Sequence, residues 1–208
     1  MGVKNIKVWL ETTYQSRDYI FNHNWKYYGT AKDLAASNYY KELFEMPFDT
    51  FILLCHSFRG GNIHNQSAPE AYEKEIYELS KYLLETYRGT GKTFIIQNWE
   101  GDWLCAGTTD RNNTAAFNDS NKHANFTNWL NAMQRGINRA RGNVTNLKRN
   151  DVYVFGMAEV NLLDYDTTKH SLIADTVIPN LNMDLYSYSN WQTMENKDML
   201  RRYVNYFK

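Results

Sequence analysis

Short apolar runs alternate with longer segments of helical periodicity along the whole chain. Runs of this length, bounded by turn signals, predict strands that are buried in a sheet. Five such runs lie at residues 3–10, 49–55, 93–97, 151–158 and 183–189.

The segments between these runs carry the signals of helices. Thr30 with Asp33 predicts a helix that continues to Glu45, and a capping-box pattern with Pro69 predicts a helix from residue 67 to Gly89. Apolar positions at helical spacing predict further helices, which lie around residues 126–142, 171–177 and 193–208. Polar stretches predict loops over 14–29 and 107–122. Strict alternation of strand and helix predicts a single α/β domain, residues 1–208, with a parallel sheet.

Composition narrows the classes of partner. Lys and Arg number 23, and so do Asp and Glu, so the chain has no net field for nucleic acid or an anionic membrane surface. We therefore expect no nucleic-acid or membrane partner, and we find neither a signal peptide nor an apolar run of membrane-spanning length. Localisation stays open. Aromatic residues make up 15% of the chain, and their flat amphipathic rings suit sugars, although most of them are expected to serve in packing.

Metal and nucleotide chemistry have little support in the sequence. Cys55 and Cys105 lack metal spacing and are expected to be free buried thiols, and the five histidines are too widely spaced for a zinc site. The segment RGTGKT at 88–93 resembles the end of a phosphate-binding loop, but Thr86 stands where that motif requires glycine, and a predicted helix precedes it. We expect a turn there, and neither a metal nor a cofactor.

Polar and aromatic residues follow the predicted strands, and two glutamates stand out among them. Glu100 and Glu159 each end a long apolar run, and the two runs are consecutive. Ligands of α/β proteins collect at the carboxyl ends of strands, so both carboxyl groups are expected to face one pocket. Two carboxylates in different environments are the machinery of glycoside hydrolysis. The alternative is that either glutamate caps a helix or pairs with an arginine.

Further strand-end residues are candidates for binding substrate. His56 lies at such an end, although a structural hydrogen-bonding role is equally open to it. The aromatic members could stack on sugar rings, but packing is an alternative for each. The candidates are His56, Arg59, Asn98, Trp99, Asp102, Trp103, Asn161, Tyr186, Tyr188 and Trp191.

The strand segments also resemble a known family. The chain is similar to the retaining glycoside hydrolases with a (β/α)8 barrel, the clan that includes cellulases and mannanases. The resemblance is carried by GVKNIKVWLE, FDTFILLCHSF, TFIIQNWEGDW, VYVFGMAEVN and MDLYSYSNW. It implies that these segments begin at the clan's second strand, that TFIIQNWEGDW is the fourth, and that Glu100 matches the acid/base glutamate.

The chain departs from the clan's pattern in two ways. Trp99 separates Asn98 from Glu100, whereas the clan has asparagine directly before its acid/base glutamate. The clan's nucleophile follows a seventh strand, which this chain lacks, and a closed barrel needs about 250 residues. The resemblance therefore implies a TIM-barrel-like sheet of five or six βα units, truncated at both ends, or an open variant. Exposed edges of such a sheet predict self-association or a missing barrel segment.

These observations lead to three hypotheses. The first is a glycoside hydrolase that acts on a β-linked glycan, with Glu100 as acid/base and Glu159 as a second acid or a substrate-positioning group. The second is a catalytically inactive carbohydrate-binding remnant, or a fragment of a larger glycosidase. The third is an open parallel-sheet domain that binds another small ligand.

Overall fold

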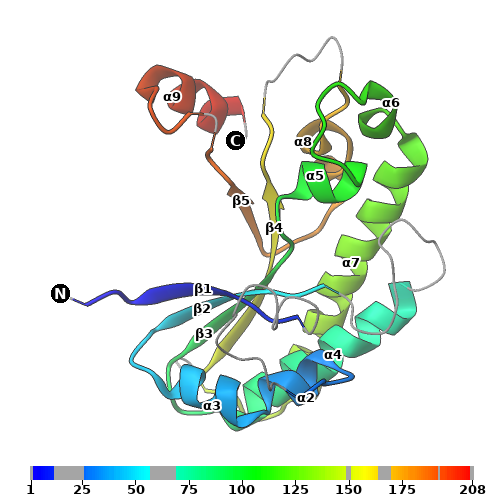
Figure 1. Cartoon of the computed structure of the whole chain (residues 1–208). Helices are drawn as coiled ribbons and strands as arrows, with labels where there is room; N and C mark the ends of the chain where they lie inside the picture. Colours follow the sequence, from blue (N-terminus) through cyan, green and yellow to red (C-terminus); the bar gives the residue numbers. More distant parts are fainter. Residues whose placement is uncertain are drawn as a thin grey trace.

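The structure is a computed structural model of the whole chain (Figure 1). It describes residues 2–11, 26–56, 69–148, 151–163, 170–191 and 193–206.

Five strands form one sheet in which every neighbouring pair is parallel. The strands follow one another across the sheet in the order of the sequence, and they are β1 (Asn5–Trp9), β2 (Thr50–Leu54), β3 (Thr93–Gln97), β4 (Tyr153–Val160) and β5 (Leu185–Tyr188). This arrangement confirms the predicted α/β class and the five predicted strands.

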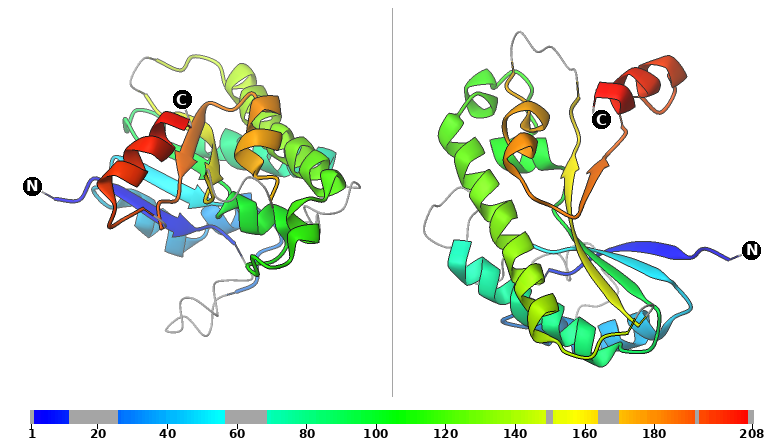
Figure 2. Two further views of the ribbon diagram at one scale, coloured as in Figure 1. Left: turned by 90° about the horizontal axis from the view of Figure 1, so that it is seen from above. Right: turned by 180° about the vertical axis from the view of Figure 1, so that it is seen from behind.

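Helices connect the strands, and the longest ones cover one face of the sheet (Figure 2). They are α2 (Ala31–Ala35), α3 (Asn38–Glu45), α4 (Pro69–Thr86), α5 (Gly101–Ala106), α6 (Thr114–Phe117), α7 (Ser120–Asn143), α8 (Ile173–Thr176), the 3-10 helix η1 (Ile178–Asn180) and α9 (Lys197–Tyr206). The α4 and α7 helices pack closely against each other, because Gly136 on α7 leaves no side chain between its backbone and that of Glu73 on α4.

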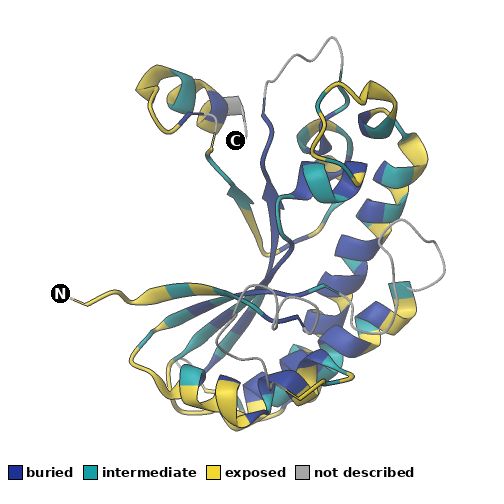
Figure 3. Ribbon diagram, viewed as in Figure 1, coloured by how far each residue is buried: buried dark blue, intermediate teal, exposed yellow. Residues whose placement is uncertain are grey.

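The core lies between the sheet and these helices. Along β2, Phe51 and Leu53 are fully buried, whereas Ile52 between them is only partly buried. The same alternation occurs on β3, as expected for side chains that point to opposite faces of a sheet. Figure 3 shows this division, with the buried positions of the helices turned toward the sheet. The sheet therefore has one face packed on helices and one face that is less covered.

The sheet curves so that its first and fourth strands come into contact through side chains. Lys7 on β1 forms an ion pair with Glu159 on β4, with a distance of 2.7 Å between Lys7 Nζ and Glu159 Oε1. Two strands, β2 and β3, lie between them in the sheet. Within the described ranges, no strand pairs with the outer edge of β1 or of β5, so the described sheet is open.

The helix predicted over 30–45 is interrupted in the structure. Thr30 caps its start as expected, with its Oγ1 accepting a hydrogen bond from the Asp33 N–H at 3.0 Å. Ser37 then adopts an extended conformation and divides the segment into α2 and α3. Of the loop predicted over 14–29, residues 14–25 lie outside the described residues, as do residues 67 and 68 of the predicted capping box.

The segment between β3 and α7 contains two helices that the sequence analysis did not predict. The α5 helix begins at Gly101, directly after the strand-end residues, and ends at Gly107, whose φ of 71° is left-handed. The loop predicted over 107–122 contains α6 and the first turn of α7, where Asn113 and Asp119 accept hydrogen bonds from the first backbone N–H groups. The α5 helix has six residues and the α6 helix has four, and helices this short show no helical periodicity in the sequence.

Candidate functional site

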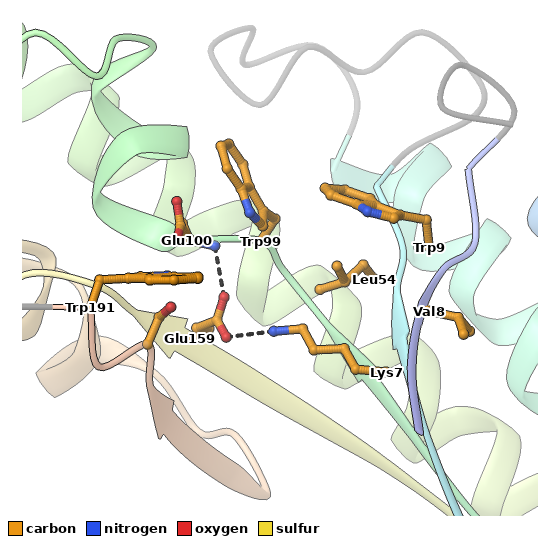
Figure 4. A pocket seen from close by; sticks show the side chains of 9 residues that line it. Lys7, Val8, Trp9, Leu54, Trp99, Glu100, Glu159 and Trp191 are labelled. Atoms are coloured by element: carbon orange, nitrogen blue, oxygen red, sulfur yellow. Dashed lines mark hydrogen bonds and ion pairs between the residues drawn. The ribbon is translucent and has the colours of Figure 1, made fainter. Parts of the chain in front are cut away.

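A pocket of about 340 Å³ lies at the carboxyl end of the sheet (Figure 4). Its lining comes from three strands and from the segments that follow β3 and β5. The lining residues are Lys7, Val8, Trp9, Leu54, Trp99, Glu100, Glu159, Ser189 and Trp191. Both glutamates singled out in the sequence therefore line the same pocket.

The Glu159 carboxylate is buried and accepts three hydrogen bonds. Its Oε1 accepts from Lys7 Nζ at 2.7 Å and from Gln97 Nε2 at 3.1 Å. Its Oε2 accepts from the backbone N–H of Glu100 at 2.8 Å. Three donors, one of them cationic, fix the orientation of the carboxylate.

Glu100 occupies a strained position at the start of α5. Its φ of 25° and ψ of 78° are rare for a residue with a side chain, and such strain is found at functional sites. Partial burial raises the pKa of its carboxyl group above the ordinary value of 4.5, and the charge of Glu159 acts in the same direction. Hydrogen bonds from Trp191 and Ser189 and the charge of Lys7 act in the opposite direction. The two carboxyl groups therefore have different environments: the Glu100 carboxyl has a raised pKa, and the Glu159 carboxylate is held by three hydrogen-bond donors.

Three indole rings border the pocket. Trp9 and Trp99 contact each other with ring centroids 6.1 Å apart and planes tilted by 46°. Trp191 comes from the opposite edge of the sheet and is 71% exposed (Figure 4). A large ring that stays exposed beside the buried Glu159 and the partly buried Glu100 is a surface on which a flat amphipathic ligand can stack.

Asn98 lies beneath the pocket and joins β3 to β4. Its side chain is fully buried, accepts a hydrogen bond from the Glu159 N–H at 2.9 Å and donates one to the Glu159 carbonyl at 3.0 Å. Asn98 does not line the pocket, and its contacts set the position of Glu159 instead.

Asp102 and Asn161 also join neighbouring segments. The Asn161 side chain accepts from the Asp102 N–H at 2.8 Å, while the Asp102 carboxylate accepts from the backbone N–H groups of Asn161, Leu162 and Ile173, each at 3.0 Å. Both side chains are buried. Their polar atoms face the backbone, so the structure gives them structural hydrogen bonds outside the pocket lining.

Three of the predicted aromatic residues lie away from the pocket. Trp103 packs on Phe117 with ring centroids 5.8 Å apart, and Tyr188 packs on Tyr203 at 6.2 Å. The Tyr186 hydroxyl donates to the Leu181 carbonyl at 3.2 Å, near the start of β5.

His56 lies behind the pocket wall. Its Nδ1 contacts the Glu11 carboxylate, and its Nε2 accepts a hydrogen bond from the Trp99 N–H at 3.3 Å. Both ring nitrogens are therefore engaged within the protein. Arg59 lies outside the described residues.

The sequence did not single out Lys7, Trp9, Gln97, Glu11 and Ser189, although each contacts the pocket or its supporting residues. Lys7, Trp9 and Glu11 are spaced two residues apart, which places them on one face of the first strand and its continuation. The alternation of these three residues could have been read from the sequence. It identifies them as pocket residues only if the sheet curves, and the sequence of one strand does not reveal the curvature of the sheet.

Other kinds of site have less support among the described residues. A second pocket of about 490 Å³ lies beside α7, α8 and η1, and its lining of hydroxyl, amide, alanine and histidine side chains contains no carboxylate. The described part of the chain contains no group of three or more His, Cys, Asp or Glu residues arranged to hold a metal ion. None of the helices within the described ranges has the length and apolar character that a bilayer-crossing segment requires.

No protein-family model, curated protein or solved structure matches the chain.

Proposed function

We propose that the protein is a glycoside hydrolase-like protein that acts on a β-linked glycan at this pocket. The observation that carries the proposal is the convergence of Glu100 and Glu159 on one pocket bordered by tryptophans. Glycoside hydrolysis requires one carboxyl group that can donate a proton to the leaving oxygen and a second group that stays ionised.

In this proposal Glu100 is the general acid/base. Its raised pKa keeps the carboxyl group protonated to a higher pH than an exposed glutamate, as proton donation requires. Glu159, held by Lys7, Gln97 and the Glu100 N–H, is the ionised partner or a substrate-positioning group. Trp191 would stack on a sugar ring at the open side of the pocket.

The proposal includes a barrel-type architecture. Parallel strands in sequential order, linked mostly by helices, are the arrangement of a (β/α) barrel. The contact between Lys7 and Glu159 across two intervening strands supports the same curvature. We propose that the described sheet is a partial barrel of this kind.

A carbohydrate-binding protein without turnover is the second candidate, and the surroundings of Glu159 favour it. Its carboxylate is buried and already paired with Lys7, and removing a charge from such a pair is costly. A carboxylate held in this way can orient a ligand hydroxyl without attacking the anomeric carbon.

Glu100→Gln tests the catalytic proposal. The substrates are β-linked glucose and mannose oligosaccharides and the corresponding dinitrophenyl glycosides, whose leaving groups need no protonation. We expect kcat/KM for the oligosaccharides to fall by about 10²–10⁴-fold and that for the dinitrophenyl glycosides to fall much less. The matched control is Glu85→Gln, because Glu85 is an exposed residue of α4 paired with Lys81.

Assays of oligosaccharide hydrolysis and binding by the unaltered protein distinguish the enzyme from the binding protein. Hydrolysis of an oligosaccharide, lost in Glu100→Gln and kept in Glu85→Gln, supports the enzyme. Saturable oligosaccharide binding without hydrolysis supports the binding protein, and the absence of both contradicts the carbohydrate proposal.

A further inference from the structure

We propose that His56 is a positioning residue: Glu11 holds its imidazole with the proton on Nδ1, and its Nε2 fixes the turn that presents Trp99 and Glu100 to the pocket. Its effect on turnover rests on the proposed function. The geometry of the turn does not.

The hydrogen-bond partners of the His56 ring determine its tautomer. Nε2 accepts a hydrogen bond from the Trp99 N–H at 3.3 Å, so it carries a lone pair and no proton. Nδ1 faces the Glu11 carboxylate, which only accepts hydrogen bonds, so the proton lies on Nδ1. A protonated Nε2 would place two donors against each other.

Glu11 holds both the backbone and the ring of His56. Its Oε1 accepts from the His56 backbone N–H at 3.0 Å and also contacts Nδ1. The Glu11 side chain is buried. A buried carboxylate that accepts two hydrogen bonds from one residue leaves that residue few alternative orientations.

Aromatic rings hold the imidazole from two directions. The Trp9 ring meets it edge-on with centroids 6.2 Å apart, and the Trp129 ring lies at 5.9 Å. Trp129 is itself stacked on Tyr72, with centroids 4.5 Å apart and planes only 5° apart. Rotation of the His56 ring therefore requires displacement of packed side chains.

The turn after β3 is held at two consecutive peptide groups. His56, two residues after the end of β2, accepts from the Trp99 N–H, and Glu159 on β4 accepts from the Glu100 N–H. One acceptor therefore follows β2 and the other lies on β4, and these are the two strands that flank β3. Glu100 has its strained φ of 25° at the second of these groups. We infer that the two hydrogen bonds maintain the strained conformation and therefore the direction of the Glu100 side chain.

Two substitutions separate the two functions of the ring. In His56→Gln the side-chain oxygen can take the place of Nε2 and accept from the Trp99 N–H. In His56→Asn the amide nitrogen can take the place of Nδ1 and donate to Glu11, but the acceptor for Trp99 is lost. The two variants are matched in polarity and each keeps one contact of the ring, so a change at Trp99 that occurs in His56→Asn and not in His56→Gln reports on the contact with Trp99.

The first measurement uses the unaltered protein and nitrogen NMR of labelled histidine. We expect His56 Nδ1 to give a protonated, pyrrole-type signal and Nε2 an unprotonated, pyridine-type signal at neutral pH. A proton on Nε2 would overturn the proposal, whatever the behaviour of the variants.

The second measurement is amide hydrogen exchange at Trp99, with the carbon-13 titration of Glu100 followed in parallel. In His56→Asn we expect exchange at Trp99 to be faster by about tenfold, as the loss of one hydrogen bond predicts. We also expect the Glu100 midpoint to move down toward that of an exposed glutamate, with both effects absent in His56→Gln. Unchanged exchange and an unchanged midpoint in folded His56→Asn would contradict the proposal.

These outcomes separate this inference from the proposed function, because neither measurement uses a substrate. The expected tautomer and exchange in a protein without turnover would reject the hydrolase proposal and leave His56 as the positioning residue. Turnover in a protein with the opposite tautomer would do the reverse.

Discussion

At the scale of single residues, Asp102 illustrates what a sequence can and cannot reveal. Its place two residues after Glu100 made it a candidate for substrate binding, yet its carboxylate accepts from backbone N–H groups of Asn161, Leu162 and Ile173. Side-chain type and position mark a polar residue at a strand end. They do not show which backbone donors will surround it, because those donors belong to segments about 60 to 70 residues away.

Asp102→Ala is expected to destabilise the protein strongly. The substitution leaves three backbone N–H groups without their acceptor in the interior, and we expect a loss of about 3 kcal/mol or more in the free energy of unfolding. Urea denaturation measures it. The control is Asp198→Ala on α9, whose side chain is 92% exposed and which should change stability by less than about 0.5 kcal/mol. Equal effects of the two substitutions would contradict the structural role of Asp102.

The same carboxyl group predicts a pH dependence of stability. Burial raises the pKa of Asp102 from 3.8 to about 6, although hydrogen bonds from the backbone oppose the change. Because the folded state binds this proton more tightly, the stabilising contribution is complete below pH 3.8 and is lost as the pH rises through about 6. Unfolding measured between pH 4 and 7 should show this fall in the unaltered protein and a flatter profile in Asp102→Ala. Identical stability profiles of the unaltered protein and Asp102→Ala would contradict the raised pKa of Asp102.

At the scale of elements, the five strands were predictable and α5 was not. The strands are apolar runs flanked by turn signals, and every run became a strand of the sheet. The α5 helix has six residues, too few for a periodic apolar face, and it starts at a glycine. What fixes this helix is close contact with the sheet, which no local pattern encodes. Lys7 and Trp9 were missed for a related reason, since they reach the pocket only through the curvature of the sheet.

Gly101 at the start of α5 permits this contact. A Cβ at this position would lie 2.3 Å from the Glu159 carbonyl oxygen and 2.4 Å from Ile173 Cδ1. Gly101→Ala must therefore push α5 away from β4, and we expect a loss of about 1–3 kcal/mol in the free energy of unfolding, together with weaker binding of the oligosaccharides of the proposed function. Thermal unfolding and ligand titration measure the two effects.

Gly142 on α7 provides the matched control. A Cβ there would meet nothing within 4 Å. Gly142→Ala should therefore leave binding unchanged and leave stability unchanged or raised by up to about 1 kcal/mol, because alanine favours a helix. A Gly101→Ala protein as stable as Gly142→Ala would show that α5 is free to move away from β4.

At the scale of the whole molecule, the open sheet has consequences for association. The described sheet ends at β1 and β5, and Leu185 and Tyr186 on β5 are 37% and 39% exposed. Backbone groups on part of the β4 edge already have side-chain partners and are not free to pair with another strand. Asp184 accepts a hydrogen bond from the Gly156 N–H, and Arg141 donates one to the Val154 carbonyl, each at 2.9 Å. An unprotected edge with exposed apolar side chains is a template for pairing with another strand.

We therefore expect the protein to self-associate as its concentration rises. Sedimentation velocity over a range of concentrations measures this. Leu185→Lys should weaken the association, because a lysine on an edge strand opposes pairing, whereas Met46→Lys, at an exposed position after α3, should not. A monomer at every concentration would contradict the expectation.

The pH dependence of β-glycoside hydrolysis by the unaltered protein tests the central claim most directly. General acid catalysis by Glu100 requires its protonated form, so the rate should fall as the pH rises through the Glu100 pKa. Because burial and Glu159 raise that pKa, this fall should occur above pH 4.5. Hydrolysis that declines in this way, with a decline that is lost in Glu100→Gln, is the predicted result. Hydrolysis with no such decline, or no hydrolysis at any pH, would contradict the role of Glu100 as the general acid.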